Sequence, residues 1–385
     1  MSNSPISAAN WSFPTKVWFG LGRATEIVAA LDEIGAHNPL LVTDQGLATH
    51  PMITEMQAAL SAASIPHGFF TEIKPNPTGS NVEAGAVALR DGKHDSVIAV
   101  GGGSALDAAK AIALMVGQDK SIWEFEDIGD NWRAVNAAAM LPVIALPTTS
   151  GTGSELGRSS VITQEDPHRK VIIFHPDMLP ELVIMDPALT IDLPATLTAA
   201  TGMDALSHAL EAYCTPGYHP MADGLALQAM LMIRDSLVVA VKHGDDIEAR
   251  STMLAASGMA CIALQKGLGA MHAISHPLGA VYDVHHGMLN AVLMPYVLDF
   301  NLPVIDQKLA VLAKTLLLGD EAKDFIDWIK GMRIRLGVPN TLGALGLNVN
   351  DPDLIAYAAA KDPCAQGNPI FLDATAALQI LKSAS

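Results

Sequence analysis

A chain of 385 residues is long for a single hydrophobic core, so two domains are expected. Half of the residues are hydrophobic and 16% are charged, which is typical of a globular protein and excludes a disordered or low-complexity class. The formal net charge of −17 argues against nucleic acid or an anionic membrane as a partner.

The cysteines and the absence of targeting signals indicate the cytoplasm. The three cysteines, Cys214, Cys261 and Cys364, are odd in number and widely spaced, as expected for free thiols in a reducing compartment. The first residues lack the basic and apolar regions of a signal peptide. The longest uncharged stretch, residues 134–154, is interrupted by prolines and glycines, so we do not expect it to span a membrane.

The N-terminal half shows short apolar runs typical of strands, separated by helical patterns. In chain order the sequence predicts a strand at 15–19, a helix at 24–34, a strand at 39–43, helices at 53–63 and 81–91, a strand at 96–100, a helix at 105–111, a strand at 142–146, a hairpin strand at 170–174 and a last strand at 183–187.

Three of these strands end in segments suited to a nucleotide. The strand at 39–43 ends at Asp44, where α/β sheets place ligand-binding side chains. Residues 101–104 (Gly-Gly-Gly-Ser) open a helix, and the glycines let the backbone approach a phosphate at the positive end of that helix. Residues 147–155 (Pro-Thr-Thr-Ser-Gly-Thr-Gly-Ser-Glu) offer many hydroxyls at the same edge of the sheet. Ordinary turns are the alternative for each loop alone.

From residue 189 onward the strand patterns stop and Ala-, Leu- and Met-rich helical patterns continue to the end. The expected organisation is therefore an α/β, Rossmann-like dinucleotide-binding domain at residues 1–187 and an all-helical domain at residues 188–385. The phosphate-binding candidates lie in the first domain and the metal-binding candidates in the second. We therefore expect the active cleft between the two domains.

A cluster of histidines in the second domain indicates a metal. His272 and His276 are four residues apart, so they would point from one face of a helix, and His286 follows after a proline and a glycine. Three convergent imidazoles suit zinc or iron(II) and not a hard ion such as calcium. Asp204 and His208, again four residues apart, would complete a site of three or four ligands. A helix end with satisfied core histidines is the alternative.

The ordered set of these motifs resembles the iron-containing (group III) alcohol dehydrogenases. The likeness covers nearly the whole chain, from Trp18-Phe19-Gly20 to Cys364 and the Gly-Asn-Pro at 367–369. It implies a dehydroquinate synthase-like fold, in which a dinucleotide-binding domain precedes a helical domain. It also implies a single Fe²⁺ in the cleft and a homodimer or a higher homo-oligomer.

The resemblance also implies roles for individual residues. The implied metal ligands are Asp204, His208, His272 and His286, whereas His276 matches a histidine beside the metal and the nicotinamide that acts as a proton relay. His285 matches no ligand. The implied cofactor site contains Asp44, Asn76, Gly101, Gly102, Gly103, Ser104, Asp107, Thr148, Thr149, Thr152 and Lys170. A carboxylate at Asp44 would bind the ribose and repel a 2′-phosphate, which favours NAD(H) over NADP(H).

The implied reaction is hydride transfer between the nicotinamide and a short-chain alcohol or aldehyde, with the metal as Lewis acid on the substrate oxygen. The chain is slightly longer before His272 than typical members, and residues 265–269 (Gln-Lys-Gly-Leu-Gly) resemble the 4-hydroxybutyrate dehydrogenase branch. Lys266 is therefore a candidate anchor for an anionic tail of the substrate, and Arg158, just past the threonine-rich loop, is a second. Cys364 is a further candidate substrate residue. A solvated Lys266 at a helix end is the alternative.

Other functions on this fold stay open. Two are enzymes, a zinc-dependent polyol (glycerol-type) dehydrogenase and a sugar-phosphate cyclase, and a third is a non-catalytic NAD-binding sensor. Zinc binds the same ligands at least as tightly as iron, so the ligand types do not distinguish Fe²⁺ from Zn²⁺. In each enzyme the expected partners are a small molecule and further copies of this chain.

Overall fold

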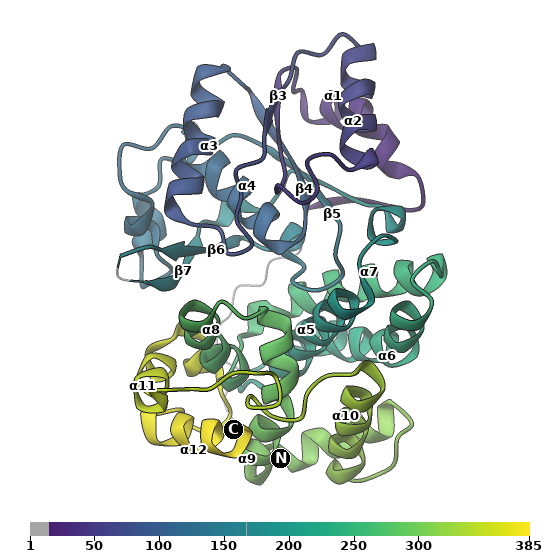
Figure 1. Ribbon diagram of the computed structural model, residues 1–385, viewed down its shortest axis with the longest axis vertical. Helices are drawn as coiled ribbons and strands as arrows, with labels where there is room; N and C mark the ends of the chain where they lie inside the picture. The colour runs from purple at the N-terminus through teal and green to yellow at the C-terminus, as the bar shows by residue number, and fades with distance from the viewer. Residues whose placement is uncertain (1–14, 167) are drawn as a thin grey trace.

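The computed structural model describes residues 15–166 and 168–385. An α/β part comes first in the chain and an all-helical part follows it, one above the other in Figure 1. The last strand of the α/β part ends at Met185 and the first α-helix of the helical part begins at Ala195. The expected division at residues 187 and 188 falls in this connection, and as a boundary between independent domains it stays a prediction.

Six parallel strands form the sheet of the α/β part, in the order β1-β8-β5-β4-β2-β3. Five of them were predicted, β1 from an alternating pattern and the other four from apolar runs. β3 has only three residues, Gly-Phe-Phe, and is too short to show a period. The strands are β1 (Lys16–Phe19), β2 (Pro39–Val42), β3 (Gly68–Phe70), β4 (Ser96–Gly101), β5 (Val143–Pro147) and β8 (Leu182–Met185).

Helices cover both faces of this sheet, which is why its strands are apolar without alternation. Val97 and Ala99 of β4 pack into one core cluster with α3 (Gly79–Asp91) and α4 (Gly103–Met115). Ile98 and Val100 of the same strand face the opposite cluster, which contains residues of α1 (Ile27–Ile34) and α2 (Pro51–Ala62).

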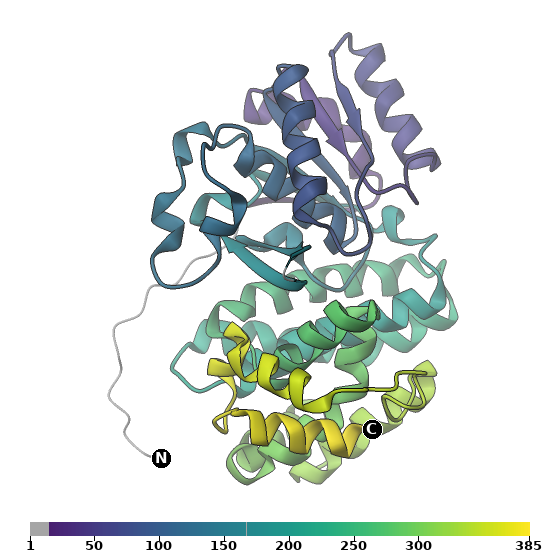
Figure 2. The ribbon, with the colours of Figure 1, turned by 60° about the vertical axis from the view of Figure 1, so that its left-hand side comes forward.

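A two-stranded antiparallel hairpin extends from the α/β part to the helical part. It consists of β6 (Ser159–Gln164) and the predicted β7 (Arg169–Phe174). Figures 1 and 2 place it between the sheet and the helical part, and a ring nitrogen of His168 lies 2.9 Å from the carbonyl oxygen of Ala280 in α8. The hairpin therefore forms one wall of the space between the two parts.

The helical part is built around α5, which is buried on nearly every side and packs against α6, α7 and α9. By length and composition α6 and α9 are apolar enough to cross a membrane, and both pack against α5 in this bundle. The helices are α5 (Ala195–Cys214), α6 (Pro220–Lys242), α7 (Ile247–Ala263), α8 (Ala270–Tyr282), α9 (His286–Thr315), α10 (Ala322–Leu336), α11 (Pro352–Lys361) and α12 (Ala374–Ala384).

Candidate metal centre and cofactor cleft

The four candidate metal ligands come together from three helices. Asp204 and His208 lie one turn apart on α5, His272 lies in the first turn of α8, and His286 is the first residue of α9. One ligand atom from each residue lies within 4.8 Å of the other three. Oδ1 of Asp204 is 4.0 Å from Nε2 of His208 and 3.7 Å from Nε2 of His286. We call these four residues the ligand group.

The chemistry of the ligand group fits a divalent transition metal. Burial lowers the pKa of His208 to about 4. Burial, followed by the neighbouring imidazoles, lowers the pKa of His286 well below its ordinary value. Both rings are therefore neutral near pH 7 and keep the lone pairs that a metal requires. Three imidazoles and one carboxylate suit Fe²⁺ or Zn²⁺.

Glu211, three residues after His208 on α5, orients the imidazole of His272. Its carboxylate accepts a hydrogen bond from Nδ1 of His272 at 2.7 Å and bonds from the backbone N–H groups of Gly269 and Met271 at 2.9 and 2.7 Å. Nε2 of His272 is then left to face the ligand group. Burial is the largest single effect and lowers the pKa of His272, but the hydrogen bond to Glu211 and the charges of the nearby carboxylates together outweigh it, so the net pKa is raised.

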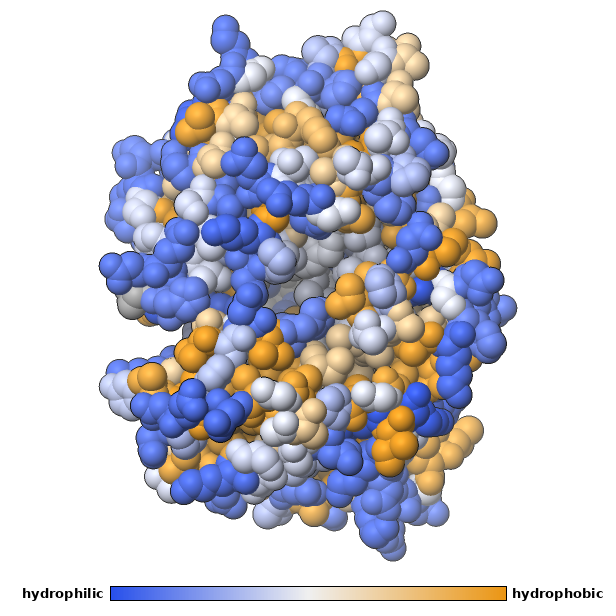
Figure 3. Space-filling view, viewed as in Figure 1, coloured by the Kyte–Doolittle hydropathy of each residue, from blue (hydrophilic) through white to orange (hydrophobic). Residues whose placement is uncertain are grey.

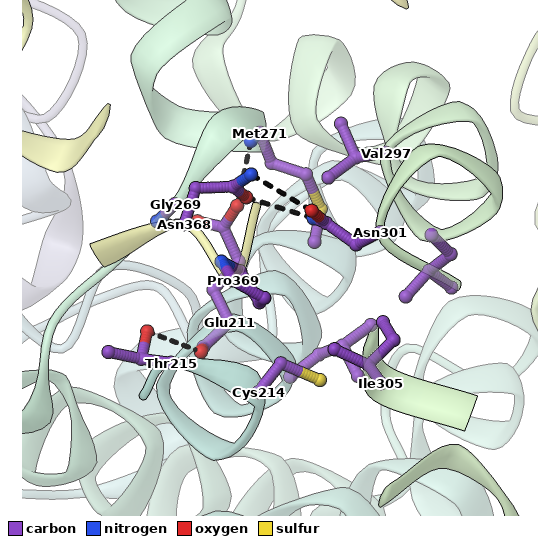
Figure 4. A pocket seen from close by; sticks show the side chains of 12 residues that line it. Glu211, Cys214, Thr215, Gly269, Met271, Val297, Asn301, Ile305, Asn368 and Pro369 are labelled. Carbon is purple, nitrogen blue, oxygen red and sulfur yellow. Dashed lines mark hydrogen bonds between the residues drawn. The ribbon is translucent and has the colours of Figure 1, made fainter. Parts of the chain in front are cut away.

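Two asparagine side chains also hold the start of α8, next to Glu211. The side chains of Asn301 and Asn368 exchange two hydrogen bonds of 2.9 Å, and Asn368 also accepts from the backbone N–H of Ala270 at 3.1 Å. Figure 4 shows this amide pair and Glu211 among the mainly apolar residues that line a small cavity at the start of α8. The start of α8, and with it His272, is therefore held in place from two sides.

Asn290, one turn after His286 on α9, reaches into the ligand group. Its amide nitrogen donates to Oδ1 of Asp204 at 2.9 Å and lies 3.1 Å from Nε2 of both His272 and His286. Its oxygen is buried and has no hydrogen-bond partner within the described part of the chain. Three acceptor atoms thus converge on one donor, which is the arrangement that a cation also requires.

His276 lies one turn after His272 on α8, beside the ligand group. Its ring stacks on that of His286, with ring centroids 5.3 Å apart. Its Nδ1 is 2.8 Å from Oδ2 of Asp362, which caps the 3-10 turn η9 (Pro363–Gly367). Burial raises the pKa of Asp362, but the charge and hydrogen bond of His276 and the hydrogen bonds from Cys364 together outweigh burial, so the net pKa is lowered. Asp362 therefore fixes the orientation of His276 as a carboxylate.

The opposite wall of the cleft is the carboxyl edge of the sheet, where Asp44 follows β2. Its Oδ1 accepts hydrogen bonds from the backbone N–H groups of Gly46 and Leu47 at 2.8 and 3.1 Å. A Cβ placed on Gly101 would lie 3.5 Å from Oδ2 of Asp44 and 2.6 Å from the Cβ of Ala105, and Gly101 has φ +149°. Only glycine therefore fits at 101, next to this carboxylate.

The glycine-rich and threonine-rich loops lie in contact at this edge. A Cβ on Gly103 would approach Thr152 to 2.6 Å, and one on Gly102 would approach Thr149 to 3.2 Å. The backbone N–H of Thr148 donates to the carbonyl of Gly101 at 3.0 Å. Both loops therefore surround the N-terminus of α4, which begins at Gly103 and favours a phosphate group.

Two further cofactor candidates, Ser104 and Asn76, make contacts that lead from this edge of the sheet to the helical part. The hydroxyl of Ser104 donates to the carbonyl of Pro75, and the amide of Asn76 donates to Asp283 at 2.6 Å. Asp283 ends α8 with a positive φ of 52°. The chain around Asn76 therefore bridges the α/β part and the helix that carries His272.

The carboxylate of Asp107 is bonded to other residues of the α/β part. It accepts from the hydroxyl of Ser154 at 2.5 Å and from the backbone N–H of Val161 at 2.9 Å, and the ammonium of Lys110 is 3.4 Å away. These contacts tie α4 to the threonine-rich loop and to β6. Asp107 therefore positions the loop, and a direct contact with the cofactor stays a prediction.

Lys170 on β7 lies between the two walls. Lys170 is half-buried, and its ammonium would be 3.4 Å from a Cβ on Gly279 of α8. Burial lowers its pKa, while the carboxylates of Asp204 and Asp107 act in the opposite direction. The charges of Asp204 in the ligand group and of Asp107 on α4 therefore both act on Lys170. Figure 3 shows a hollow between the two parts of the molecule.

The three candidate substrate residues have different surroundings. The ammonium of Lys266 contacts the carboxylate of Asp223 and the carbonyl of Tyr213, and its side chain is only 3% exposed. It is thus bound at the C-terminal end of α5 and is not brought to the ligand group. The guanidinium of Arg158 lies over the ring of Phe174 at 5.6 Å. Cys364 is buried and donates its backbone N–H to Asp362 at 2.8 Å.

Three residues of the site, Glu211, Asn290 and Asp362, were not identified from the sequence. Glu211 and Asn290 do carry a signal, because they lie three and four residues after candidate ligands on the same helices. Asp362 carries none, since it is 86 residues from His276 in the chain. The three cysteines are buried and free, as predicted.

Comparison with known proteins gives a consistent result along the chain. Residues 14–187 match the family model "Iron-containing alcohol dehydrogenase", and residues 198–385 match the model "Fe-containing alcohol dehydrogenase family, C-terminal". The chain is 37% identical to a 4-hydroxybutyrate dehydrogenase of Cupriavidus necator, over 92% of this chain and 94% of the relative. It is 35% identical to an NAD-dependent methanol dehydrogenase of Bacillus methanolicus, over 97% and 99%. The structure of a 1,3-propanediol oxidoreductase superimposes with a TM-score of 0.93 at 33% identity, covering 98% of this chain and 100% of that one.

Proposed function

Because the chain belongs to the iron-containing alcohol dehydrogenase family, we propose that it is an NAD(H)-dependent and metal-dependent dehydrogenase of short-chain alcohols and aldehydes. The single observation that carries this proposal is the convergence of Asp204, His208, His272 and His286 on one point beside the cleft. The glycine-rich loop at the N-terminus of α4 lies on the other side of that cleft. Metal and dinucleotide would thus meet a substrate from opposite walls.

The ligand group would hold the metal, with Glu211 fixing His272 and Asn290 in contact with three of the four ligands. A bound divalent ion supplies Lewis acidity, which lowers the pKa of an alcohol or polarises an aldehyde. Fe²⁺ is the ion that the family name indicates, and Zn²⁺ suits the same donors.

Asp44, Lys170 and the two loops would hold the NAD(H). The carboxylate of Asp44 accepts hydrogen bonds from ribose hydroxyls and repels a 2′-phosphate, which favours NAD(H). The N-terminus of α4 binds the pyrophosphate, and the hydroxyls of Thr148, Thr149 and Thr152 add polar contacts. The related methanol dehydrogenase is NAD-dependent, which agrees with this choice.

His276 would take up the hydroxyl proton that an alcohol loses when it is oxidised, and it would return a proton to the oxygen when an aldehyde is reduced. Its Nδ1 is bound to Asp362, so Nε2 is the ring nitrogen that exchanges a proton with substrate or water. An imidazole can serve as acid in one direction of the reaction and as base in the other.

We propose an ω-hydroxy acid, such as 4-hydroxybutyrate, as the preferred substrate. The relative with 37% identity is a 4-hydroxybutyrate dehydrogenase, which supports this choice. Of the two candidate anchors we propose Arg158, because Lys266 lies at the end of α5 and is not brought to the ligand group. Within the described residues, no contact in the site favours a polyol dehydrogenase, a sugar-phosphate cyclase or an NAD-binding sensor.

A steady-state panel with anaerobically Fe²⁺-loaded enzyme and NADH tests the proposal. The panel compares succinic semialdehyde with butanal, lactaldehyde and 3-hydroxypropanal, in the wild type, Arg158→Met and Lys266→Met. We expect succinic semialdehyde to have the highest kcat/KM, and the preference over butanal to fall about tenfold or more in Arg158→Met but not in Lys266→Met. Equal rates on all four aldehydes would contradict the anionic substrate, and no turnover on any would contradict the proposed activity.

We also propose that the enzyme acts in the cytoplasm as a homodimer or a higher homo-oligomer. Three buried free thiols agree with a reducing compartment. Analytical ultracentrifugation of the purified chain tests the assembly, and a monomer at micromolar concentration would contradict it.

A further inference from the structure

A second cluster of metal-binding side chains lies next to the ligand group. It consists of His276 on α8 with Asp362 and Cys364 at η9, and one ligand atom from each lies within 4.8 Å of the other two. All three side chains are nearly buried: His276 and Asp362 are 10% and 12% exposed, and Cys364 is 8% exposed. This cluster contains sulfur, whereas the ligand group contains only nitrogen and oxygen donors.

The cluster is held in a fixed arrangement. One oxygen of Asp362 is 2.8 Å from Nδ1 of His276, and the other accepts the backbone N–H of Cys364 at 2.8 Å. Just beyond η9, Asn368 is locked between the side chain of Asn301 and the backbone N–H of Ala270. The turn that carries Cys364 therefore cannot move away from α8 without breaking these bonds, which means that the three donors are pre-organised.

We propose that His276, Asp362 and Cys364 form a second site for a thiophilic divalent cation such as Zn²⁺, and that its occupation inhibits the enzyme. A thiolate, an imidazole and a carboxylate are ligands that Zn²⁺ prefers and that Mg²⁺ and Ca²⁺ do not. On binding, Sγ of Cys364 forms a bond to the cation and its proton leaves to solvent. Nδ1 of His276 also bonds to the cation, and the proton on Nδ1 leaves to solvent. Nε2 takes up a proton from solvent, so the ring stays neutral. No group is oxidised or reduced.

The inhibitory effect follows from the shared residue. His276 stacks on His286 of the ligand group, so the two sites are neighbours. With a cation on Nδ1, the ring carries a proton on Nε2 and has no lone pair left to accept the substrate proton there. The existence of the second site is independent of the proposed function, but the inhibitory effect rests on it.

Cobalt(II) distinguishes the two sites, because a bond between Co²⁺ and a thiolate gives a near-ultraviolet charge-transfer band that nitrogen and oxygen ligands do not give. Enzyme loaded with one equivalent of Fe²⁺ is titrated with CoCl₂ without oxygen, in the wild type, Cys364→Ser and Cys261→Ser. Cys261 is the matched control, since it is equally buried (8% exposed) and lies in α7. Circular dichroism verifies that each variant is folded.

We expect the band to saturate with one further equivalent of Co²⁺ in the wild type and in Cys261→Ser, and to be absent from Cys364→Ser. No band in the wild type, or a band that persists in Cys364→Ser, would overturn the second site. A band lost in folded Cys261→Ser would also overturn it, because the thiolate would then be elsewhere.

Inhibition by zinc tests whether a cation bound at the second site lowers the activity of the enzyme. Excess ZnCl₂ should lower the activity of the Fe²⁺-loaded wild type about 100-fold or more, the contribution of a positioned acid or base, and the fractional loss should be much smaller in Cys364→Ser. A cobalt band without zinc inhibition would overturn the inhibitory role alone. An enzyme inactive before zinc is added would contradict the proposed function, while the cobalt band would still decide the second site.

Discussion

Replacing Glu211 by Gln should weaken metal binding although all four candidate ligand residues are unchanged. The Glu211 carboxylate is 5% exposed and accepts three hydrogen bonds, one of them from Nδ1 of His272. A glutamine offers one oxygen, so its amide N–H₂ would face at least one of these N–H donors. Leaving one buried donor unpaired costs about 1–3 kcal/mol of folding free energy. Loss of the bond that orients His272 should lower metal affinity about 10–100-fold, or about 1.4–2.7 kcal/mol.

Metal affinity is measured by competition against a chelator of known strength, without oxygen and at constant pH. Urea unfolding of the metal-free protein measures the loss of stability separately. Glu155→Gln is the matched control, because Glu155 is also a buried carboxylate but lies in the α/β part and, within the described residues, makes no hydrogen bond to a candidate ligand. A folded Glu211→Gln variant that binds the metal as tightly as the wild type would refute the assigned role of Glu211, as would an equal loss of affinity in Glu155→Gln.

Three further outcomes are expected. Asp362→Asn should lower kcat about 10–100-fold and change the pH–rate profile while metal content stays the same, since it disorients His276; an unaltered profile would contradict this. Burial raises the pKa of Glu155 to about 7 from an ordinary 4.5, so the native state holds an extra proton between these values and stability falls as pH rises through them. Glu155→Gln should abolish that fall and be up to about 3 kcal/mol more stable than the wild type in urea unfolding at about pH 8, with no gain at about pH 4. Asp44→Asn should raise the NADP(H)-to-NAD(H) ratio of kcat/KM about tenfold, and an unchanged ratio would remove Asp44 from the ribose site.

The sheet was largely predictable because its strands are buried on both faces and read as short apolar runs. The strand at 96–100 shows this best, since the structure extends it by a single residue to Gly101. The two strands that were missed lack such a run. β3 has three residues, and β6 reads Ser-Ser-Val-Ile-Thr-Gln, which is too polar to stand out without its partner β7.

The ligand group was predictable in part, because helical spacing places Asp204 beside His208 whatever the rest of the chain does. Spacing alone does not separate His286 from His276 or His285, and this choice came from the family resemblance. The supporting contacts are beyond local sequence. Asp362 reaches His276 across 86 residues, and Lys266 meets Asp223 across 43, so their partners depend on how the helices pack.

The most direct test of the central claim is a titration of metal-free enzyme with Fe²⁺, without oxygen, in which bound iron and aldehyde reduction by NADH are measured on the same samples. Activity should rise in proportion to the first equivalent of bound iron, and His272→Ala should neither bind that equivalent tightly nor turn over. Full activity in metal-free enzyme, or in His272→Ala, would contradict the assignment of Asp204, His208, His272 and His286 as the catalytic metal centre.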